Sequence, residues 1–225
     1  MTLTRGRFTY AGHGASPIEG RDVVSHRSYG SSVRTASAAV PSRFGLAALF
    51  LATVAAFVVV GSADGGGRAW TAYLAPAAAC KGSTDPAASA AVQSRAVRCL
   101  MNWARARDRR GRLAPSSSLK RAAALKGRGV ASCGQLSHTP CGSDLTGPVR
   151  RSGYRYSSFG ENIFVGPWGA VTARDVVAAW LQSPGHRANV LRRGFRHLGA
   201  APVRASGVLG GGAEVVWVAT FASPR

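Results

Sequence analysis

The stretch "ARDVVAAWLQSPGHRANVL", residues 173 to 191, indicates how this chain folds. Thr172 and Asp175 have the spacing of a capping box, with Asp in place of the more usual Glu, so an amphipathic helix is expected to begin here. Ser183 and Pro184 predict a second helix start, because Ser is a favoured N-cap and Pro is favoured at the first helical position. The stretch therefore predicts two consecutive helices, with His186 in the first turn of the second.

The segments on either side complete the expected architecture. Upstream, residues 88–107 have apolar residues at helical spacing, with Gln93 and Arg105 off the buried face, and a second helix is expected over 119–130 after an N-cap at Ser117. Downstream, residues 197–203 and 214–222 are strand-like and are joined by a Gly-rich run, which predicts a β-hairpin. Helices followed by strands, without strict alternation, indicate an α+β layered domain.

An uncharged apolar run occupies residues 44–60 and is followed by small residues to 63. Its length is at the lower edge of a bilayer span, so the segment 44–63 is expected to be a signal peptide or a transmembrane anchor. The basic arm of residues 1–43 is expected to be disordered and to stay on the cytoplasmic side. Residues 64–87 resemble a linker, and 88–225 would form the exported domain.

The charge of the chain is strongly positive, with 29 Lys and Arg against 9 Asp and Glu and a formal net charge of +20. After residue 44 there are still 23 basic and 7 acidic residues. This balance favours anionic partners such as cell-surface polymers or lipids. Nucleic acid is a less favoured partner, because neither a zinc-finger pattern nor interleaved aromatic and basic residues are present.

The four cysteines, Cys80, Cys99, Cys133 and Cys141, all follow the apolar run. An even number of cysteines on the exported side predicts two disulfides. Three pairings are conceivable, of which the local one joins Cys80 to Cys99 and Cys133 to Cys141. The second bond would then restrain the loop that contains His138.

Few residues after position 64 can act as ligands or as acid–base groups. His138 lies in the restrained loop, Glu161 precedes a buried stretch and needs a partner, and His186 lies at a helix start whose dipole favours the neutral imidazole. His197 is expected to be structural, and Glu214 to lie at the solvent end of the last strand. Neither HExxH, paired CxxC, G-x-S-x-G nor a phosphate-binding Gly-rich loop is present.

Three motifs in this order resemble the CAP superfamily, which includes the cysteine-rich secretory, antigen 5 and pathogenesis-related proteins. They are "SHTP" (137–140), "GYRYSSFGENIFVG" (153–166) and "VVAAWLQSPGHRANVLRRGFRHLGAA" (176–201), and "LMNWARARDRRG" (100–111) is similar to the opening helix of that family. The resemblance covers residues 88 to 223. It implies a three-layer α-β-α sandwich of the SCP-like type.

The resemblance also implies a central cleft that binds zinc or another divalent cation in some members. His138 and His186 match its two histidines, and Glu161 matches its glutamate. Animal and plant members carry a second glutamate shortly before the second histidine, whereas residues 177–182 contain no acid here. The expected ligand set is therefore His138, Glu161 and His186, as in bacterial members.

These observations predict an extracellular protein, secreted or anchored at the membrane, that acts as a cell-surface binding module with a cation-capable cleft. The alternative is a metal-assisted hydrolase in which Glu161 is the general base. A third class, an interaction protein without any function in the cleft, would need neither histidine.

Overall fold

The computed structural model describes residues 69–225, which form an α-β-α sandwich. The predicted basic arm and the signal or anchor segment lie outside these residues. The sheet has the order β1-β3-β4-β2, in which β4 pairs antiparallel with both β2 and β3, and the short β1 pairs parallel with β3. The strands are β1 (Ala114–Pro115), β2 (Tyr156–Pro167), β3 (His197–Ser206) and β4 (Ala213–Pro224).

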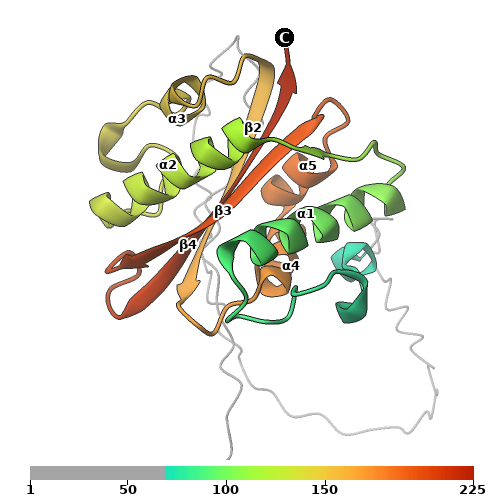
Figure 1. The fold of residues 1–225 in the computed structure, drawn as a ribbon, viewed down its shortest axis with the longest axis horizontal. Helices are drawn as coiled ribbons and strands as arrows, with labels where there is room; N and C mark the ends of the chain where they lie inside the picture. Colours follow the sequence, from blue (N-terminus) through green and yellow to red (C-terminus); the bar gives the residue numbers. More distant parts are fainter. Residues whose placement is uncertain (1–68) are drawn as a thin grey trace, which may run out of the picture. The chain divides into compact units, whose positions relative to one another are not determined.

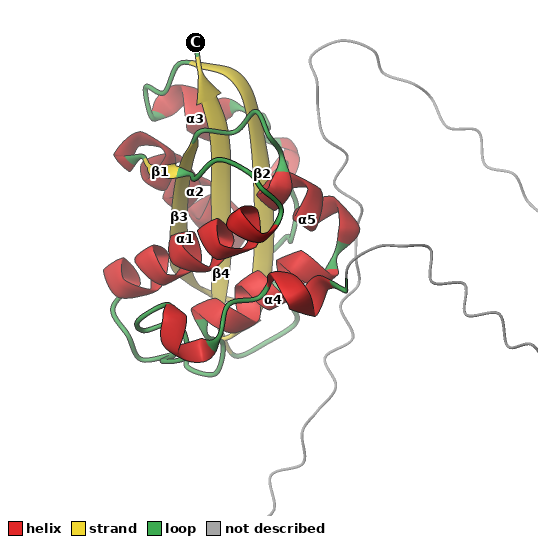
Figure 2. Cartoon of the chain, turned by 90° about the vertical axis from the view of Figure 1, so that its right-hand side faces the viewer, coloured by secondary structure: helices red, strands yellow, loops and turns green. Residues whose placement is uncertain are grey.

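Helices cover both faces of this sheet. They are α1 (Ala90–Arg107), α2 (Ser117–Cys133), α3 (Gly147–Arg151), α4 (Ala173–Gln182) and α5 (Pro184–Leu191). In Figure 1 the strands run diagonally between α2 and α3 on one side and the layer of α1, α4 and α5 on the other. Figure 2 shows the second layer from the front, with α5 next to β2 at the sheet edge. The three-layer class expected from the sequence is confirmed.

Alternation along β4 explains why both faces are covered. Val215, Trp217 and Ala219 pack into the cluster formed with α1 and α4, whereas Val216 and Val218 pack into the cluster below α2. Because successive side chains of a strand point to opposite faces, an almost wholly apolar strand must be buried on both sides. The predicted hairpin between β3 and β4 is confirmed by their antiparallel register.

The helix starts lie where the capping signals predict, although the Ser183 side chain makes no capping hydrogen bond to α5. Thr172 and Asp175 form the predicted capping box, in which the Thr172 side chain accepts from the Asp175 amide and the Asp175 side chain accepts from the Thr172 amide. Pro184 occupies the first turn of α5 after Ser183, as expected. The N-cap of α2 is Ser116, one residue before the predicted Ser117. Among residues 69–225, no helix is both long and apolar enough to cross a membrane.

The prediction that Arg105 lies off the buried face of α1 is wrong. Its guanidinium is fully buried and donates to four carbonyl oxygens, those of Gly111, Val190, Arg192 and Phe195, at 2.6–3.2 Å. Burial, followed by the neighbouring Arg110 and Arg196, lowers the pKa of Arg105 to about 10. A helical pattern assigns charged residues to solvent, but these carbonyls replace the lost water.

Gln93 and Glu214 are also buried, contrary to expectation. The Gln93 amide donates to the carbonyls of Pro86 and Ala88. The Glu214 carboxylate accepts from the amides of Val208 and Leu209 at 2.8 and 2.9 Å and so holds the Gly-rich tip of the hairpin. Both side chains are buried because local backbone groups satisfy them.

The segment 69–87, which the composition assigns to a linker, contributes to the packed core. It contains two short 3-10 helices, Trp70–Tyr73 and Ala77–Ala79, and buries Tyr73, Ala75 and Cys80. The disulfide between Cys80 and Cys99 ties this segment to α1, with a Cα–Cα distance of 5.7 Å. This disulfide and the one between Cys133 and Cys141 confirm the local pairing.

Candidate functional site

Glu161 lies on the edge strand β2, on the side of the sheet that faces α2. Ile163 and Val165, at the alternate positions of the same strand, pack against α2 in the core. The side chain of Glu161 is only 3% exposed. A carboxylate buried to this extent needs compensating partners, and it receives two.

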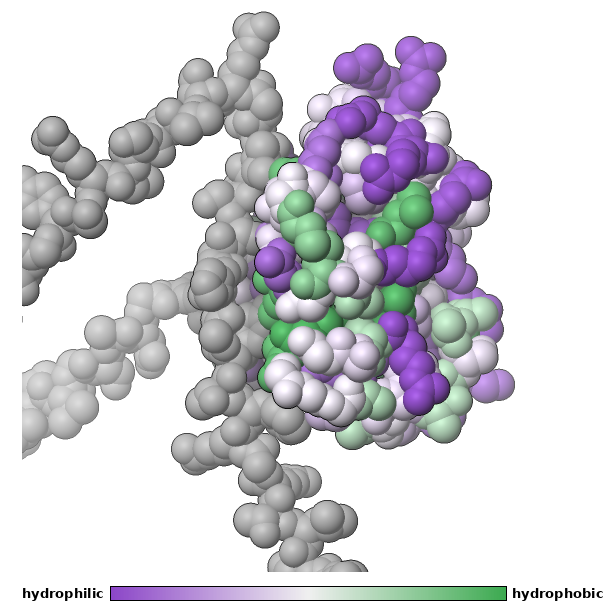
Figure 3. Space-filling view, turned by 90° about the vertical axis from the view of Figure 1, so that its left-hand side faces the viewer, coloured by the Kyte–Doolittle hydropathy of each residue, from purple (hydrophilic) through white to green (hydrophobic). Residues whose placement is uncertain are grey.

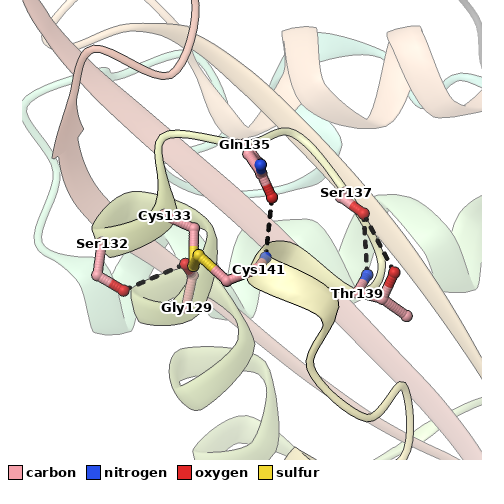
Figure 4. The surroundings of a disulfide bond; sticks show 7 residues. All are labelled: Gly129, Ser132, Cys133, Gln135, Ser137, Thr139 and Cys141. Atoms are coloured by element: carbon pink, nitrogen blue, oxygen red, sulfur yellow. Dashed lines mark hydrogen bonds between the residues drawn. A yellow bond between two sulfur atoms is a disulfide. The ribbon is translucent and has the colours of Figure 1, made fainter.

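His138 is the first partner, and it comes from the loop that the second disulfide closes. Its Nδ1 donates to Glu161 Oε1 at 2.9 Å, since an ionised carboxylate only accepts hydrogen bonds. The imidazole is 36% exposed, so it links the buried carboxylate to the surface. Figure 4 shows how the loop is held: beside the disulfide, Gln135 accepts a hydrogen bond from the Cys141 amide at 2.8 Å.

Lys126, on α2, is the second partner and was not predicted from the sequence. Its ammonium nitrogen lies 3.7 Å from Glu161 Oε1, and its side chain is 1% exposed. The same ammonium donates to the carbonyl oxygens of His138 and Leu145. Lys126 therefore neutralises the carboxylate and also fixes the loop that carries His138.

The sequence did contain a signal for Lys126. Leu119, Ala122, Ala123 and Val130 define the buried face of α2, and Lys126 lies on that face, four residues after Ala122 and four before Val130. A lysine on an apolar helix face needs an acidic partner, and Glu161 and Glu214, each beside an apolar strand, are the two glutamates that could supply it. The composition of the helix alone could not show that α2 crosses β2 at this residue.

His186, on α5, forms the other side of the site at the sheet edge. Asn162 donates to its carbonyl oxygen at 3.0 Å, and Asn189 donates to the carbonyl of Glu161 and to Asn162 Oδ1. Burial, together with the nearby His138, lowers the pKa of His186 to about 4. The imidazole is therefore neutral at neutral pH. His138 and Glu161 are in direct contact, and His186 is close enough to His138 to feel its charge. That the three side chains act as one site stays a prediction.

The residues present do not fit a resident divalent cation in this arrangement. Glu161 Oε1 already receives the His138 proton and faces the Lys126 ammonium, so an ion bound there would lie close to a buried positive charge. No three His, Cys, Asp or Glu side chains in residues 69–225 are grouped as a metal site requires. The zinc site that the resemblance implies is untested, and the position of Lys126 argues against it.

The two remaining candidates lie outside this site. His197 is on β3, where its Nδ1 and Tyr154 Oη are 2.5 Å apart. Glu214 is at the start of β4 and binds backbone amides of the hairpin. The structure thus separates structural from candidate functional residues, as the sequence predicted for His197.

The model of the cysteine-rich secretory protein (CAP) family matches residues 99–221, so the chain belongs to this family. A relative is the Bacillus subtilis protein YkwD, which is 30% identical over 141 residues. That alignment covers 61% of this chain and 54% of YkwD, so the chain spans about half the length of this relative.

Solved structures similar to this chain have low identity and modest overlap. An extracellular SCP-domain protein of Bacillus anthracis is 21% identical, with a TM-score of 0.49, and 58% of this chain aligns with 40% of that one. An outer surface protein of Borrelia burgdorferi is 16% identical, with a TM-score of 0.48 over 56% of this chain and 87% of that one. A cysteine-rich secretory protein of Staphylococcus aureus is 17% identical, with a TM-score of 0.48 over 61% and 40%.

Proposed function

We propose that this protein is an extracellular binding module for anionic polymers of the cell surface. Two disulfides and no free cysteine among the described residues suit an oxidising compartment. The apolar run at 44–60 would direct the domain there, whether it is cleaved or kept as an anchor.

The engagement of the acidic side chains carries the proposal. Asp108 and Asp144 pair with Arg110 and Arg150, and Asp85 accepts from the Ala87 amide. Asp175 caps α4, while Glu161 and Glu214 are buried. All the acidic side chains of residues 69–225 therefore have partners in the domain. Lys and Arg side chains far outnumber them, with 23 basic against 7 acidic residues after residue 44, so the surface field favours anions.

The exposed face also fits a polar ligand. Figure 3 views the side of the molecule that carries α2 and α3, where hydrophilic residues gather toward the upper end and separate several hydrophobic patches lower down. His138 lies in the loop that follows α2, with part of its imidazole accessible. A hydrogen-bonding and cationic surface of this kind suits polyanions better than apolar ligands.

The hydrolase alternative has less support from the site. A general base must reach the proton that it removes, and the Glu161 carboxylate is buried between His138 and Lys126. The accessible member of the pair is the imidazole, which Glu161 orients. We therefore favour Glu161 as a structural anchor of the loop over Glu161 as a base.

Binding to a soluble, labelled poly(glycerol phosphate), measured with the full-length chain at several salt concentrations, tests the proposal. We expect affinity to fall steeply between about 50 and 300 mM salt, because screening weakens exposed charges. Absent or salt-independent binding would contradict it. Shortening of the polymer by the wild-type chain, lost in Glu161→Gln, would instead support the hydrolase.

A further inference from the structure

A cavity of about 250 Å³ opens near the edge of the sheet opposite to Glu161, between α1 and the start of α2. Its floor is β3 at Leu198, Gly199 and Ala200. Arg95 and Arg98 of α1 line one wall, and Lys120 of α2 lines the other. The cavity shares no residue with the site around Glu161.

The charge of this cavity is uncompensated. Arg95, Arg98 and Lys120 contribute three positive charges, and no acidic residue lines the cavity. The ion pairs found in residues 69–225 use other cations, and the carboxylates there are engaged elsewhere. Three cations around one concave space repel each other, and an anion placed between them would relieve that repulsion.

The hydrogen-bonding groups of the cavity are suited to an oxyanion. Ser94, Ser116 and Ser117 add hydroxyl groups to its lining. The first amides of the 17-residue helix α2, at Ser117 and Ser118, have no partner within the helix, and the helix dipole there favours negative charge. Ser116 Oγ already caps the helix by accepting from Leu119.

Gly199 brings the start of α2 onto the cavity floor. A Cβ at this position would lie 2.0 Å from Leu119 C and Lys120 N, so the first turn of α2 rests directly on the backbone of β3. This contact fixes Lys120 and the free amides relative to the sheet, while α1 presents its arginines from across the cavity. The cationic side chains of α1 and α2 therefore line one cavity whose floor and α2 wall are in fixed contact.

We propose that this cavity binds a phosphate group. Two guanidinium groups with planar forks of donors suit a tetrahedral oxyanion, and the ammonium adds a third charge. Binding of the phosphate itself is independent of the proposed function. The identity of the molecule that bears the phosphate, a phosphodiester polymer of the cell surface, rests on that function.

Titration of the full-length chain with inorganic phosphate, at an ionic strength held constant with chloride, tests the site. We expect saturable binding that weakens by about tenfold in Arg98→Gln and in Lys120→Gln, since each change removes a charged hydrogen-bond donor. Arg155→Gln, which removes an exposed arginine outside the cavity, should change the affinity by less than about twofold. Unsaturable binding, or equal losses in Arg155→Gln and the cavity variants, would overturn the proposal.

The same variants distinguish the possible carriers. If the cavity binds a surface polymer, poly(glycerol phosphate) should lose affinity in Arg98→Gln and Lys120→Gln but not in Arg155→Gln. If the cavity variants lose phosphate binding but keep polymer binding, the phosphate site is supported, and the proposal that it binds the surface polymer is wrong. Cavity-dependent binding to phosphatidylglycerol vesicles but not to the polymer would assign the phosphate to lipid headgroups. Thermal unfolding of each variant shows whether the fold is intact.

Discussion

Lys126 and Glu161 form a buried ion pair between α2 and β2, and the loss of either partner leaves the other charge uncompensated. We expect Lys126→Met to lower the free energy of unfolding by about 3–5 kcal/mol, because Glu161 would keep only its hydrogen bond from His138. The double variant Lys126→Met/Glu161→Gln should recover much of this loss. Urea unfolding at neutral pH measures both.

Lys120→Met provides the matched control, since Lys120 is exposed on the same helix. We expect it to change stability by less than about 0.5 kcal/mol. If the two single variants have equal stability, the ion pair of Lys126 with Glu161 does not stabilise the fold.

Zinc binding provides a second measurement on the same residues. The ammonium of Lys126 occupies the space beside the carboxylate that a cation would need, so we expect no one-to-one zinc binding to the wild-type chain by calorimetry. Lys126→Ala should bind zinc more tightly than the wild type, and His138→Ala in that background should abolish the gain. Wild-type zinc binding that is lost in His138→Ala and in His186→Ala would show that the cleft is a metal site.

The depressed pKa of His186 predicts how stability depends on pH. The folded-state pKa is about 4 against 6.5 in the unfolded chain, so between these values the unfolded chain binds more protons. Stability contributed by neutral His186 is thus present above pH 6.5 and is lost as the pH falls toward 4, by about 3 kcal/mol. In His186→Gln the loss over this range should be smaller, as measured by urea unfolding at several pH values. An equal loss in both proteins would assign the effect to other groups.

At the scale of single elements, the contact between α2 and β3 depends on glycine. A Cβ at Gly199 would meet the backbone of α2 at 2.0 Å, and backbone cannot move aside cheaply. We expect Gly199→Ala to destabilise the fold by about 3 kcal/mol, the upper end of the cost of overpacking. Thermal unfolding of purified variants measures the change.

Gly127→Ala is the matched comparison on the other side of the same contact. Its Cβ would lie 2.7 Å from Val203 Cγ2, the end of a side chain that can shift, and alanine is also the better helix former. Its cost should therefore be clearly smaller than that of Gly199→Ala. If the two variants lose similar amounts of stability, the backbone contact at Gly199 is no more restrictive than the side-chain contact at Gly127.

How far the sequence predicts these elements depends on the kind of signal. Thr172, Pro184 and the apolar β4 are local signals of capping and burial, and the elements that they predict are present. Arg105 and Lys126 are buried because partners 85 or 35 residues away in the chain surround them, those partners being Val190 and Glu161. Hydrophobic periodicity contains no information about such distant partners, so it assigned Arg105 to solvent and overlooked Lys126.

At the scale of the whole described domain, β4 joins the two halves of the core. Its odd-numbered residues pack toward α1 and α4, and its even-numbered residues pack toward α2. Within the sheet it pairs with β2 on one side and with β3 on the other. Neither layer of helices can therefore keep its core if the other separates from the strand. We expect one cooperative unfolding transition, with coincident midpoints for far-ultraviolet circular dichroism and tryptophan fluorescence.

A substitution on one face of β4 should then lower the unfolding midpoint of the cluster on the other face as well. Val218→Ala removes two methyl groups from the cluster below α2 and should cost about 2–3 kcal/mol. The fluorescence of the tryptophans, of which Trp180 and Trp217 are buried in the opposite cluster, should shift its midpoint by the same amount as the dichroism signal. A midpoint that moves in dichroism but not in fluorescence would mean that the two layers unfold independently, and that β4 does not couple the site around Glu161 to the layer of α1 and α4.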